Sequence, residues 1–275
     1  MDAATKYRVD IGARVDLSQW KTDDAEGVER ATIEARTEEN TMIIADLQHK
    51  LYAQHERSVL IVLQAMDAAG KDSTIRRVFG RVNPQGVQVK SFKRPTEDEL
   101  AHDFLWRVHK HAPRRGHIAL FNRSHYEDVL VARVDGLVPE ARWRKRYESI
   151  NGFEQALING GTEIVKIFLH LSKDRQRQKL TERLTDPTKN WKFESGDLET
   201  RSKWDAYMSA YEDAISNCNC EHTQWHIVPT DRKWYRVWVV SEIVRATLEG
   251  LEPRFPKPKL DPVSAMRLLE QMNGD

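Results

Sequence analysis

The sequence is poor in cysteine and in long apolar runs. Cys218 and Cys220 are the only cysteines among 275 residues. One C-x-C pair without a second pair of ligands is too little for a zinc site, so two free thiols in a reducing compartment are the simpler interpretation. No apolar stretch approaches the ~20 residues that a membrane-spanning helix needs. We therefore expect no contact with a membrane.

The sequence also lacks an excess of charge of either sign. There are 43 Lys and Arg residues against 42 Asp and Glu residues. A protein that binds DNA through its phosphates needs a clear cationic excess, so we expect no nucleic-acid partner, although a local cationic groove is compatible with this balance. Residues 1–10 contain acidic side chains and no apolar run, unlike a secretory signal. These features predict a cytoplasmic protein.

Strand patterns alternate with helix patterns along the chain. The run Ser58–Met66 is apolar and rich in β-branched residues, as in a strand buried on both faces. The same reasoning predicts strands at 87–92, 117–122, 163–169 and 225–229, and helices at 33–55, 96–111, 139–159 and 235–248. This order predicts an α/β fold in which helices cover both faces of a parallel sheet.

No shift in composition divides the chain, so we expect residues 1–275 to form a single domain. Residues 1–30 are polar and mixed, and predict an N-terminal arm. Residues 172–216 are charged, and their helical pattern is broken at Asp186-Pro187, which favours a mobile lid over a simple solvated face. The proline-rich stretch 253–262 is expected to run extended over the surface.

The strongest local signal is AMDAAGKD at 65–72, between the first strand and the next helix. Backbone N–H groups at a helix N-terminus bind phosphate oxygens, and Lys71 would add a positive charge there. Two departures from the usual phosphate loop are Ala65 at its first glycine and Asp72 at its last position. Asp67 supplies a carboxylate, which is a ligand that suits Mg²⁺. An ordinary strand-turn-helix is the alternative.

Two further segments carry cations where a phosphate-transfer enzyme needs them. Arg123 follows the third strand, and ligands of open α/β sheets bind at that edge. There it could stabilise charge on a transferred phosphoryl group, although a surface salt-bridge cluster would look the same. Arg183 precedes the break at Asp186, from which a lid could bring it to the reacting groups. Other cations could line a track, namely Arg76, Arg77, Lys90, Lys93, Arg94, Arg232 and Lys233.

Taken together, these motifs resemble the polyphosphate kinase 2 family. The matching segments cover almost the whole chain in the expected order: DAAGKD at 67–72, SFKRPTEDEL at 91–100, HDFLWRVHKHAP at 102–113, FNRSHYEDVL at 121–130, RLTDPTKNWKF at 183–193, DLETRSKWDAYMSAYEDA at 197–214 and VPTDRKWYR at 228–236. The resemblance implies a P-loop kinase-like three-layer fold with a helical lid. It also implies Mg²⁺-dependent transfer of phosphoryl groups between inorganic polyphosphate and adenine nucleotides. A homo-oligomer, dimer or tetramer, is expected as well.

The resemblance also assigns roles to single residues. It implies that Asp67 is the metal-linked acid, that Lys71 binds phosphate, and that Arg123 and Arg183 complete the catalytic set. Polyphosphate is expected on the loop and on nearby cations, namely Ala68, Ala69, Gly70, Lys71, Asp72, Ser73, Arg76, Arg77 and Lys93. The nucleotide is expected near Asn122, Arg123 and Glu127.

The resemblance also indicates which nucleotides accept the phosphoryl group. Many relatives carry Asp where this chain has Asn122, and the pairing of Asn122 with Glu127 resembles the subgroup that accepts both AMP and ADP. An ATP-dependent nucleoside monophosphate kinase of thymidylate-kinase-like fold is one alternative. A non-catalytic nucleotide-binding protein is another, and four retained residues argue against it, namely Asp67, Lys71, Arg123 and Arg183. Reaction direction, base selectivity and chain-length preference stay open.

Overall fold

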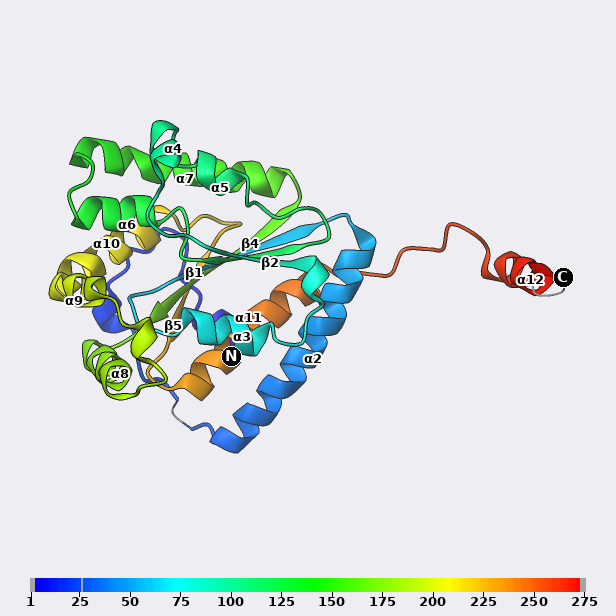
Figure 1. Cartoon of the computed structure of the whole chain (residues 1–275), viewed down its shortest axis with the longest axis horizontal. Helices are drawn as coiled ribbons and strands as arrows, with labels where there is room; N and C mark the ends of the chain where they lie inside the picture. The colour runs from blue at the N-terminus through cyan, green and yellow to red at the C-terminus, as the bar shows by residue number, and fades with distance from the viewer. Residues whose placement is uncertain (1–2, 26, 273–275) are drawn as a thin grey trace.

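The computed structural model describes residues 3–25 and 27–272 (Figure 1). Its centre is a parallel sheet with strand order β2-β3-β1-β4-β5. The strands are β1 (Ser58–Gln64), β2 (Val87–Ser91), β3 (Ile118–Asn122), β4 (Thr162–His170) and β5 (Trp225–Pro229). The expected parallel sheet is confirmed. Because the strands are parallel, the loops that follow them all leave from one edge of the sheet.

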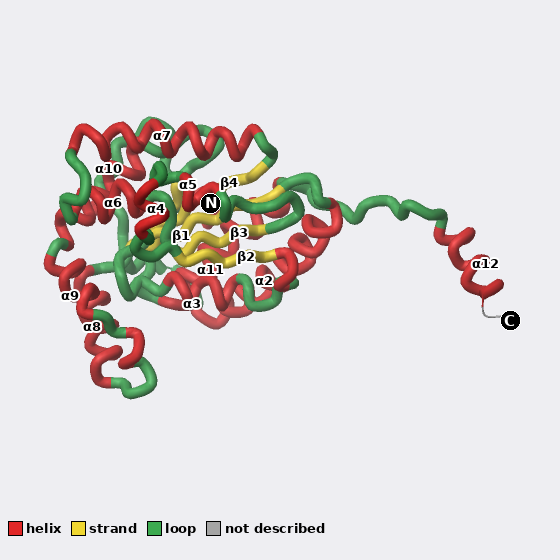
Figure 2. Tube along the Cα trace, turned by 45° about the horizontal axis from the view of Figure 1, so that its top comes forward, coloured by secondary structure: helices red, strands yellow, loops and turns green. Residues whose placement is uncertain are grey.

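Helices cover both faces of this sheet (Figures 1 and 2). All seven residues of β1 are buried, and successive side chains enter opposite cores, as a strand of period two requires. One core is closed by α2 (Arg30–Gln54), α3 (Lys71–Val78) and α11 (Lys233–Gly250). The other is closed by α6 (Glu127–Val134), α7 (Glu140–Asn159) and α10 (Trp204–Asn217). This confirms the three-layer α/β fold.

The N-terminal segment packs along the edge strand β5. It contains α1 (Ala3–Lys6) and a 3-10 turn, η1 (Leu17–Gln19). The Val9 N–H donates to the Trp225 carbonyl at 2.8 Å, and the Ile227 N–H donates to the Tyr7 carbonyl at 2.8 Å. Tyr7 and Val9 are buried. These residues, expected as an arm, thus cover the free edge of β5.

The helix predicted at 96–111 is wrong as a single element. The chain instead forms α4 (Glu97–Ala101) and α5 (Trp106–His109). The predicted capping box of Thr96 and Glu99 is confirmed at the start of α4. The break follows from Asp103, whose carboxylate accepts from the Leu105 N–H at 3.0 Å and whose carbonyl accepts from the Trp106 N–H. This local turn competes with continuation of the helix.

The segment predicted as a lid forms α8 (Lys173–Thr185), the 3-10 turn η3 (Asn190–Lys192) and α9 (Ser195–Ser202), followed by α10. The helix break predicted at Asp186 is confirmed. There the Asp186 carboxylate accepts from the Thr188 N–H at 3.0 Å and from its hydroxyl at 2.7 Å. Figure 2 shows α8 and the turn after it projecting beyond the sheet.

The chain beyond α11 leaves the body. The proline-rich stretch is extended as predicted, but it points away from the surface instead of running over it, and it ends in α12 (Pro262–Met272), which the sequence patterns did not predict (Figures 1 and 2). A further short turn, η2 (Pro84–Gly86), precedes β2. None of the helices within residues 3–25 and 27–272 combines the length and the apolar character that crossing a bilayer requires.

Candidate active site

The phosphate loop joins β1 to α3 at the edge of the sheet. Ala68 and Gly70 have positive φ angles of 64° and 96°, so the loop curls before the helix begins. Gly70 is the N-cap of α3. A Cβ at this position would lie 2.5 Å from the guanidinium of Arg236, and the left-handed backbone already disfavours other residues. Both constraints explain the glycine.

Lys71 begins α3 and folds back over the loop. Its ammonium donates to the Ala65 carbonyl at 3.0 Å. Burial lowers its pKa to about 8, and the positive charge of Arg123 adds to that effect, whereas Asp67 opposes it. The amine therefore lies beside loop carbonyls at the start of a helix, where a phosphate oxygen bound to the helix N-terminus would meet its positive charge.

Arg123 joins the loop after β3 to the phosphate loop. Its backbone has a positive φ of 60°, and its N–H donates to the Leu63 carbonyl at 3.0 Å. The guanidinium pairs with Asp67 and, at 3.4 Å, with Glu127, whose negative charge is the main cause that raises the pKa of Arg123. The Asn122 amide donates to the Asp72 carboxylate at 2.5 Å. The structure thus brings together candidates from two separate motifs.

A buried network supports the loop that carries Arg123. The Gln64 amide donates to the Ser124 hydroxyl at 3.0 Å. One step deeper, the Lys166 ammonium pairs with Glu154 at 2.7 Å, and Glu154 also accepts from the Tyr126 hydroxyl. Burial works against the charged form of Glu154, but Lys166 and His125 outweigh it and lower the pKa of Glu154.

Lys166→Met should therefore destabilise the protein strongly. It leaves the Glu154 carboxylate buried without its cation, and breaking a buried pair in this way commonly costs about 3–5 kcal/mol. Urea unfolding would measure the loss. Glu154→Gln in the same chain keeps hydrogen-bonding atoms without the charge, so we expect it to restore part of the stability. A double variant no more stable than Lys166→Met would contradict this reading.

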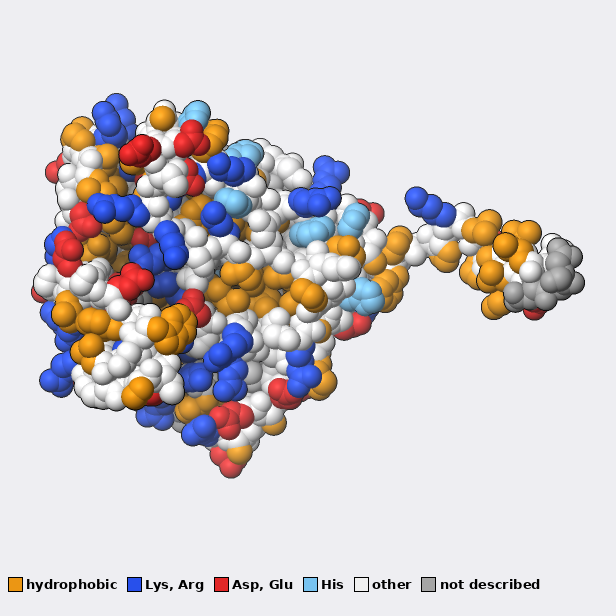
Figure 3. Space-filling model, in the orientation of Figure 1, with side chains coloured by type: hydrophobic (Ala, Val, Ile, Leu, Met, Phe, Trp, Pro, Cys, Tyr) orange, Lys and Arg blue, Asp and Glu red, His pale blue; other side chains and the backbone are white. Residues whose placement is uncertain are grey.

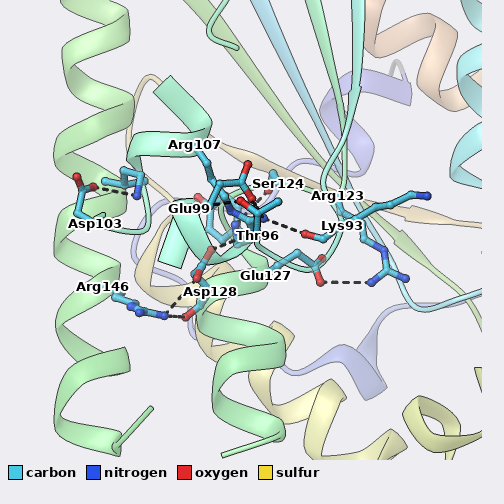
Figure 4. Close-up of polar contacts among 12 residues, drawn as sticks. Lys93, Thr96, Glu99, Asp103, Arg107, Arg123, Ser124, Glu127, Asp128 and Arg146 are labelled. Carbon is cyan, nitrogen blue, oxygen red and sulfur yellow. Dashed lines mark hydrogen bonds and ion pairs between the residues drawn. The ribbon is translucent and has the colours of Figure 1, made fainter. Parts of the chain in front are cut away.

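A second cluster fixes the loop after the edge strand β2 (Figure 4). The buried Arg107 donates to the Lys93 carbonyl at 2.9 Å and pairs with Asp128 at 3.4 Å. Arg146 pairs with the same carboxylate at 3.4 Å. Burial raises the pKa of Asp128, and the two arginines oppose the rise. Arg107 thereby holds Lys93, which is exposed, at the edge of the sheet that also carries Arg123 and Glu127.

Arg183, in the segment predicted as a lid, is paired with a carboxylate near the phosphate loop. Arg183 pairs with Asp197 at 2.9 Å. Burial raises the pKa of Asp197, and the negative charge of Asp67 contributes, so these two carboxylates are close enough to interact. The Gln176 amide, also in α8, donates to the Asp67 carbonyl at 3.0 Å. The first turns of α8 are therefore tied to the phosphate loop.

Sequence reasoning missed Arg236 as part of this site. Arg236 is buried in α11 and donates to the Ala69 carbonyl at 2.7 Å and to the Ser73 hydroxyl at 2.8 Å. Burial lowers its pKa to about 10. Its only sequence signal was its place in the segment VPTDRKWYR, where Arg232 and Lys233 were singled out instead. Arg232 pairs with Asp23 in the N-terminal segment.

A group of cations gathers along α3. The pKa of Lys233 is lowered first by burial and then by the charges of four neighbours, which are Arg77, Arg236, Arg76 and Lys179. Arg76 and Arg77 are exposed. Figure 3 shows such blue side chains over this part of the molecule. Two of the expected polyphosphate contacts, Arg76 and Arg77, thus lie beside cations from α8 and α11.

Asp67 could hold a metal only with help from a substrate. Across residues 3–25 and 27–272 there is no group of three or more His, Cys, Asp or Glu side chains placed to bind a metal. Mg²⁺ usually takes one or two carboxylates together with substrate phosphates, which agrees with a single carboxylate at the mouth of a phosphate loop. The side chain of Asp67 is 15 % exposed and balanced by Arg123. These residues fit Mg²⁺ that arrives with a phosphate chain.

Comparison with known proteins identifies the family. The model of polyphosphate kinase 2 (PPK2) matches residues 27–256. The chain belongs to the polyphosphate kinase 2 family. It is 52% identical over 257 residues to the AMP/ADP-polyphosphate phosphotransferase of Meiothermus ruber, covering 92% of this chain and 96% of that protein. It is 46% identical to the ADP-polyphosphate phosphotransferase of Rhodopseudomonas palustris, covering 92% of each.

Solved structures agree with this membership of the polyphosphate kinase 2 family. The crystal structure of polyphosphate kinase 2 from Arthrobacter aurescens TC1 matches with a TM-score of 0.94 at 39% identity, covering 98% of this chain and 97% of that chain. A second match, polyphosphate kinase 2 from Pseudomonas aeruginosa, has a TM-score of 0.78 at 29% identity and covers 86% of this chain and 49% of that one. The family, the fold and the phosphotransferase class expected from sequence are confirmed. The ATP-dependent monophosphate kinase is not favoured.

Proposed function

We propose that this protein transfers phosphoryl groups between inorganic polyphosphate and adenine nucleotides, with Mg²⁺, and that it accepts both AMP and ADP. The observation that carries the proposal is the match along almost the full chain to a relative named for both acceptors. The constellation of Asp67, Lys71, Arg123 and Glu127 supports it, because it places cations and carboxylates around one phosphate loop. Assay with polyphosphate and ADP tests the reaction.

Charge explains why the chemistry needs these residues. Two polyanions must approach in line, so catalysis rests on positioning and on charge stabilisation rather than on a protein nucleophile. We assign the end of polyphosphate to the loop 67–73, with Lys71 on its terminal phosphates and Arg76, Arg77 and Lys93 along the chain. Mg²⁺ held at Asp67 would neutralise charge on the transferred group when it is bound. Arg123 would then stabilise the same group from the opposite loop.

The lid is assigned to residues 172–216, and we expect it to move over the phosphate loop to contribute Arg183. One nitrogen of that guanidinium donates to Asp197, which leaves its other N–H groups to reach a phosphate when the segment moves toward the loop. We therefore predict that polyphosphate and nucleotide together slow amide hydrogen exchange in 172–216, with little change in the buried strand β1. Exchange measured by mass spectrometry on free and liganded protein checks this. Equal exchange in both states would contradict the lid.

Acceptor range gives a second prediction. With enzyme, Mg²⁺ and polyphosphate, AMP alone should yield ADP and then ATP. The reason is that Asn122 is neutral where relatives often carry Asp, so a nucleotide with one more phosphate meets less repulsion. Chromatography of the products over time measures both steps. Conversion of ADP with AMP left untouched would show that only the dual-acceptor assignment is wrong.

Asn122→Asp is the matching variant. Its carboxylate would face Asp72, which now accepts the Asn122 amide at 2.5 Å, so two like charges would meet beside the acceptor. Because ADP carries one more phosphate than AMP, we expect ADP use to fall more than AMP use if this position governs the choice. Asn122→Ser, which adds no charge, is the control and should change the ratio of the two rates little.

Location and assembly complete the proposal. We infer a cytoplasmic enzyme, which is consistent with free thiols at Cys218 and Cys220. A homo-oligomer, dimer or tetramer, is also proposed. Sedimentation of the purified protein would measure its mass against the 32.0 kDa of one chain.

A further inference from the structure

The C-terminal helix α12 stands clear of the body with its apolar face uncovered. Ala265, Met266, Leu268, Leu269 and Met272 fall on one side of the helix at 100° per residue, whereas Ser264, Arg267, Glu270 and Gln271 fall on the other together with Val263. Met266, Leu268, Leu269 and Met272 are each more than half exposed. An isolated helix of 11 residues is marginal in water, so this face needs an apolar surface to pack against.

The linker before α12 holds the helix away from its own chain. Its start is fixed on α2, where the Arg254 N–H donates to the Gln54 side chain at 3.4 Å and the Phe255 ring meets the His49 ring edge-on at 5.4 Å. Pro256, Pro258 and Pro262 then follow, with no glycine between. Such a segment behaves as a semi-rigid spacer of ~3.1 Å per residue. Figures 1 and 2 both show it leading outward.

The body offers an uncovered apolar groove of matching character. It has a volume of about 360 Å³ and lies between α3 and the edge strand β2, lined mainly by Ile75, Phe79, Val82, Pro84, Val87 and Val89. Arg76, which we assign to polyphosphate, also contributes to its lining. Val89 is 52% exposed, and Figure 3 shows an orange patch over these elements. An exposed edge strand with an apolar face is a surface that proteins usually cover.

We propose that α12 of one copy docks in the α3–β2 groove of a second copy of this chain. A dimer with two-fold symmetry would bury both helices and both grooves at once. Two-fold symmetry is the commonest form of closed oligomer. The stiff linker favours a second copy over the helix's own groove, since its own groove would require the linker to reverse. The polar side of α12 carries one Arg and one Glu. Helices that lie on membranes are usually rich in cations, so this composition favours a protein surface over a membrane.

Disulfide trapping tests the contact directly. One copy carries Leu269→Cys and a second copy, made longer by a tag, carries Val89→Cys, both with Cys220→Ser to remove the exposed native thiol. After mixing and mild oxidation we expect a covalent dimer of mixed size. Gln271→Cys, on the polar side of α12, is the matched control and should give at least about tenfold less. None of these positions belongs to the proposed phosphoryl-transfer site, so the result does not depend on activity.

The experiment gives a different result if α12 docks on its own chain or on a membrane. A chain that carries both cysteines and closes on itself, while the mixed pair stays unlinked, would show that α12 returns to its own groove and would overturn the proposal. Absence of any link would also overturn it. Light scattering provides a second measurement, in which Met266→Glu with Leu269→Glu should lower the mass and Gln271→Glu should not. Binding of the unsubstituted chain to anionic phospholipid vesicles, without a change in mass on substitution, would assign α12 to a membrane instead.

Discussion

Lys71→Ala is expected to abolish phosphoryl transfer and to leave the fold intact. Lys71 starts α3, and its ammonium lies over the phosphate loop rather than in the core. Removing a charge that stabilises a transferred group commonly costs 10² or more in rate, and we expect at least ~10²-fold here. Initial rates with polyphosphate and ADP measure the loss, and circular dichroism checks the fold.

Two controls sharpen this result. Lys71→Arg keeps a positive charge, although its planar head does not match a point charge, so we expect partial activity. Because burial lowers the pKa of Lys71 to about 8, its charge is present below that pH and is lost above it. In the unsubstituted enzyme kcat/KM should therefore fall as pH rises through about 8, since this ratio reports groups of the free enzyme. Activity of Lys71→Ala within about tenfold of the unsubstituted enzyme would refute the assignment.

Asp67→Asn should lower turnover strongly and raise the Mg²⁺ concentration needed for half-maximal rate. The substitution keeps the shape of the side chain but removes the charge that would attract the metal. It also removes the charge that pairs with Arg123. A titration of rate against Mg²⁺ at saturating substrates measures both effects.

The partner of Asp67 distinguishes metal binding from a structural ion pair. Arg123→Lys weakens the pair with Asp67 and Glu127 but leaves the Asp67 carboxylate in place. We expect it to reduce the rate without a comparable change in the Mg²⁺ requirement. An unchanged Mg²⁺ dependence in Asp67→Asn would mean that Asp67 serves the loop structure alone.

Local patterns predicted most of the sheet and the loop. The run at Ser58–Met66 identified β1, because a strand buried on both faces has a continuous apolar signature. Lys71 and Gly70 followed from their place after that strand. The order of the strands in the sheet could not be predicted from local patterns, because it depends on packing between segments far apart in the chain. The helix expected at 96–111 failed where a single side chain, Asp103, makes a competing turn.

Long-range contacts explain the residues that sequence reasoning missed. Arg236 lies 167 positions from the carbonyl of Ala69 that it binds, and no local pattern links the two. Arg123 and Asp67 were both named, but their pairing depends on β3 lying next to β1. α12 is a different case, because its apolar residues Ala265, Leu268, Leu269 and Met272 do recur at helical spacing, so a local pattern for this helix is present in the sequence.

The hydrogen bonds from Arg236 to the phosphate loop have a consequence for folding during synthesis on the ribosome. Residues 65–73 emerge early, yet the side chain that braces Ala69 and Ser73 lies in α11, which is translated some 160 residues later. At ~5–20 residues per second, that interval lasts on the order of ten seconds or more. Throughout it the nascent chain carries an unbraced loop. The enzyme therefore cannot acquire its phosphate-binding geometry before nearly all of its length has been made.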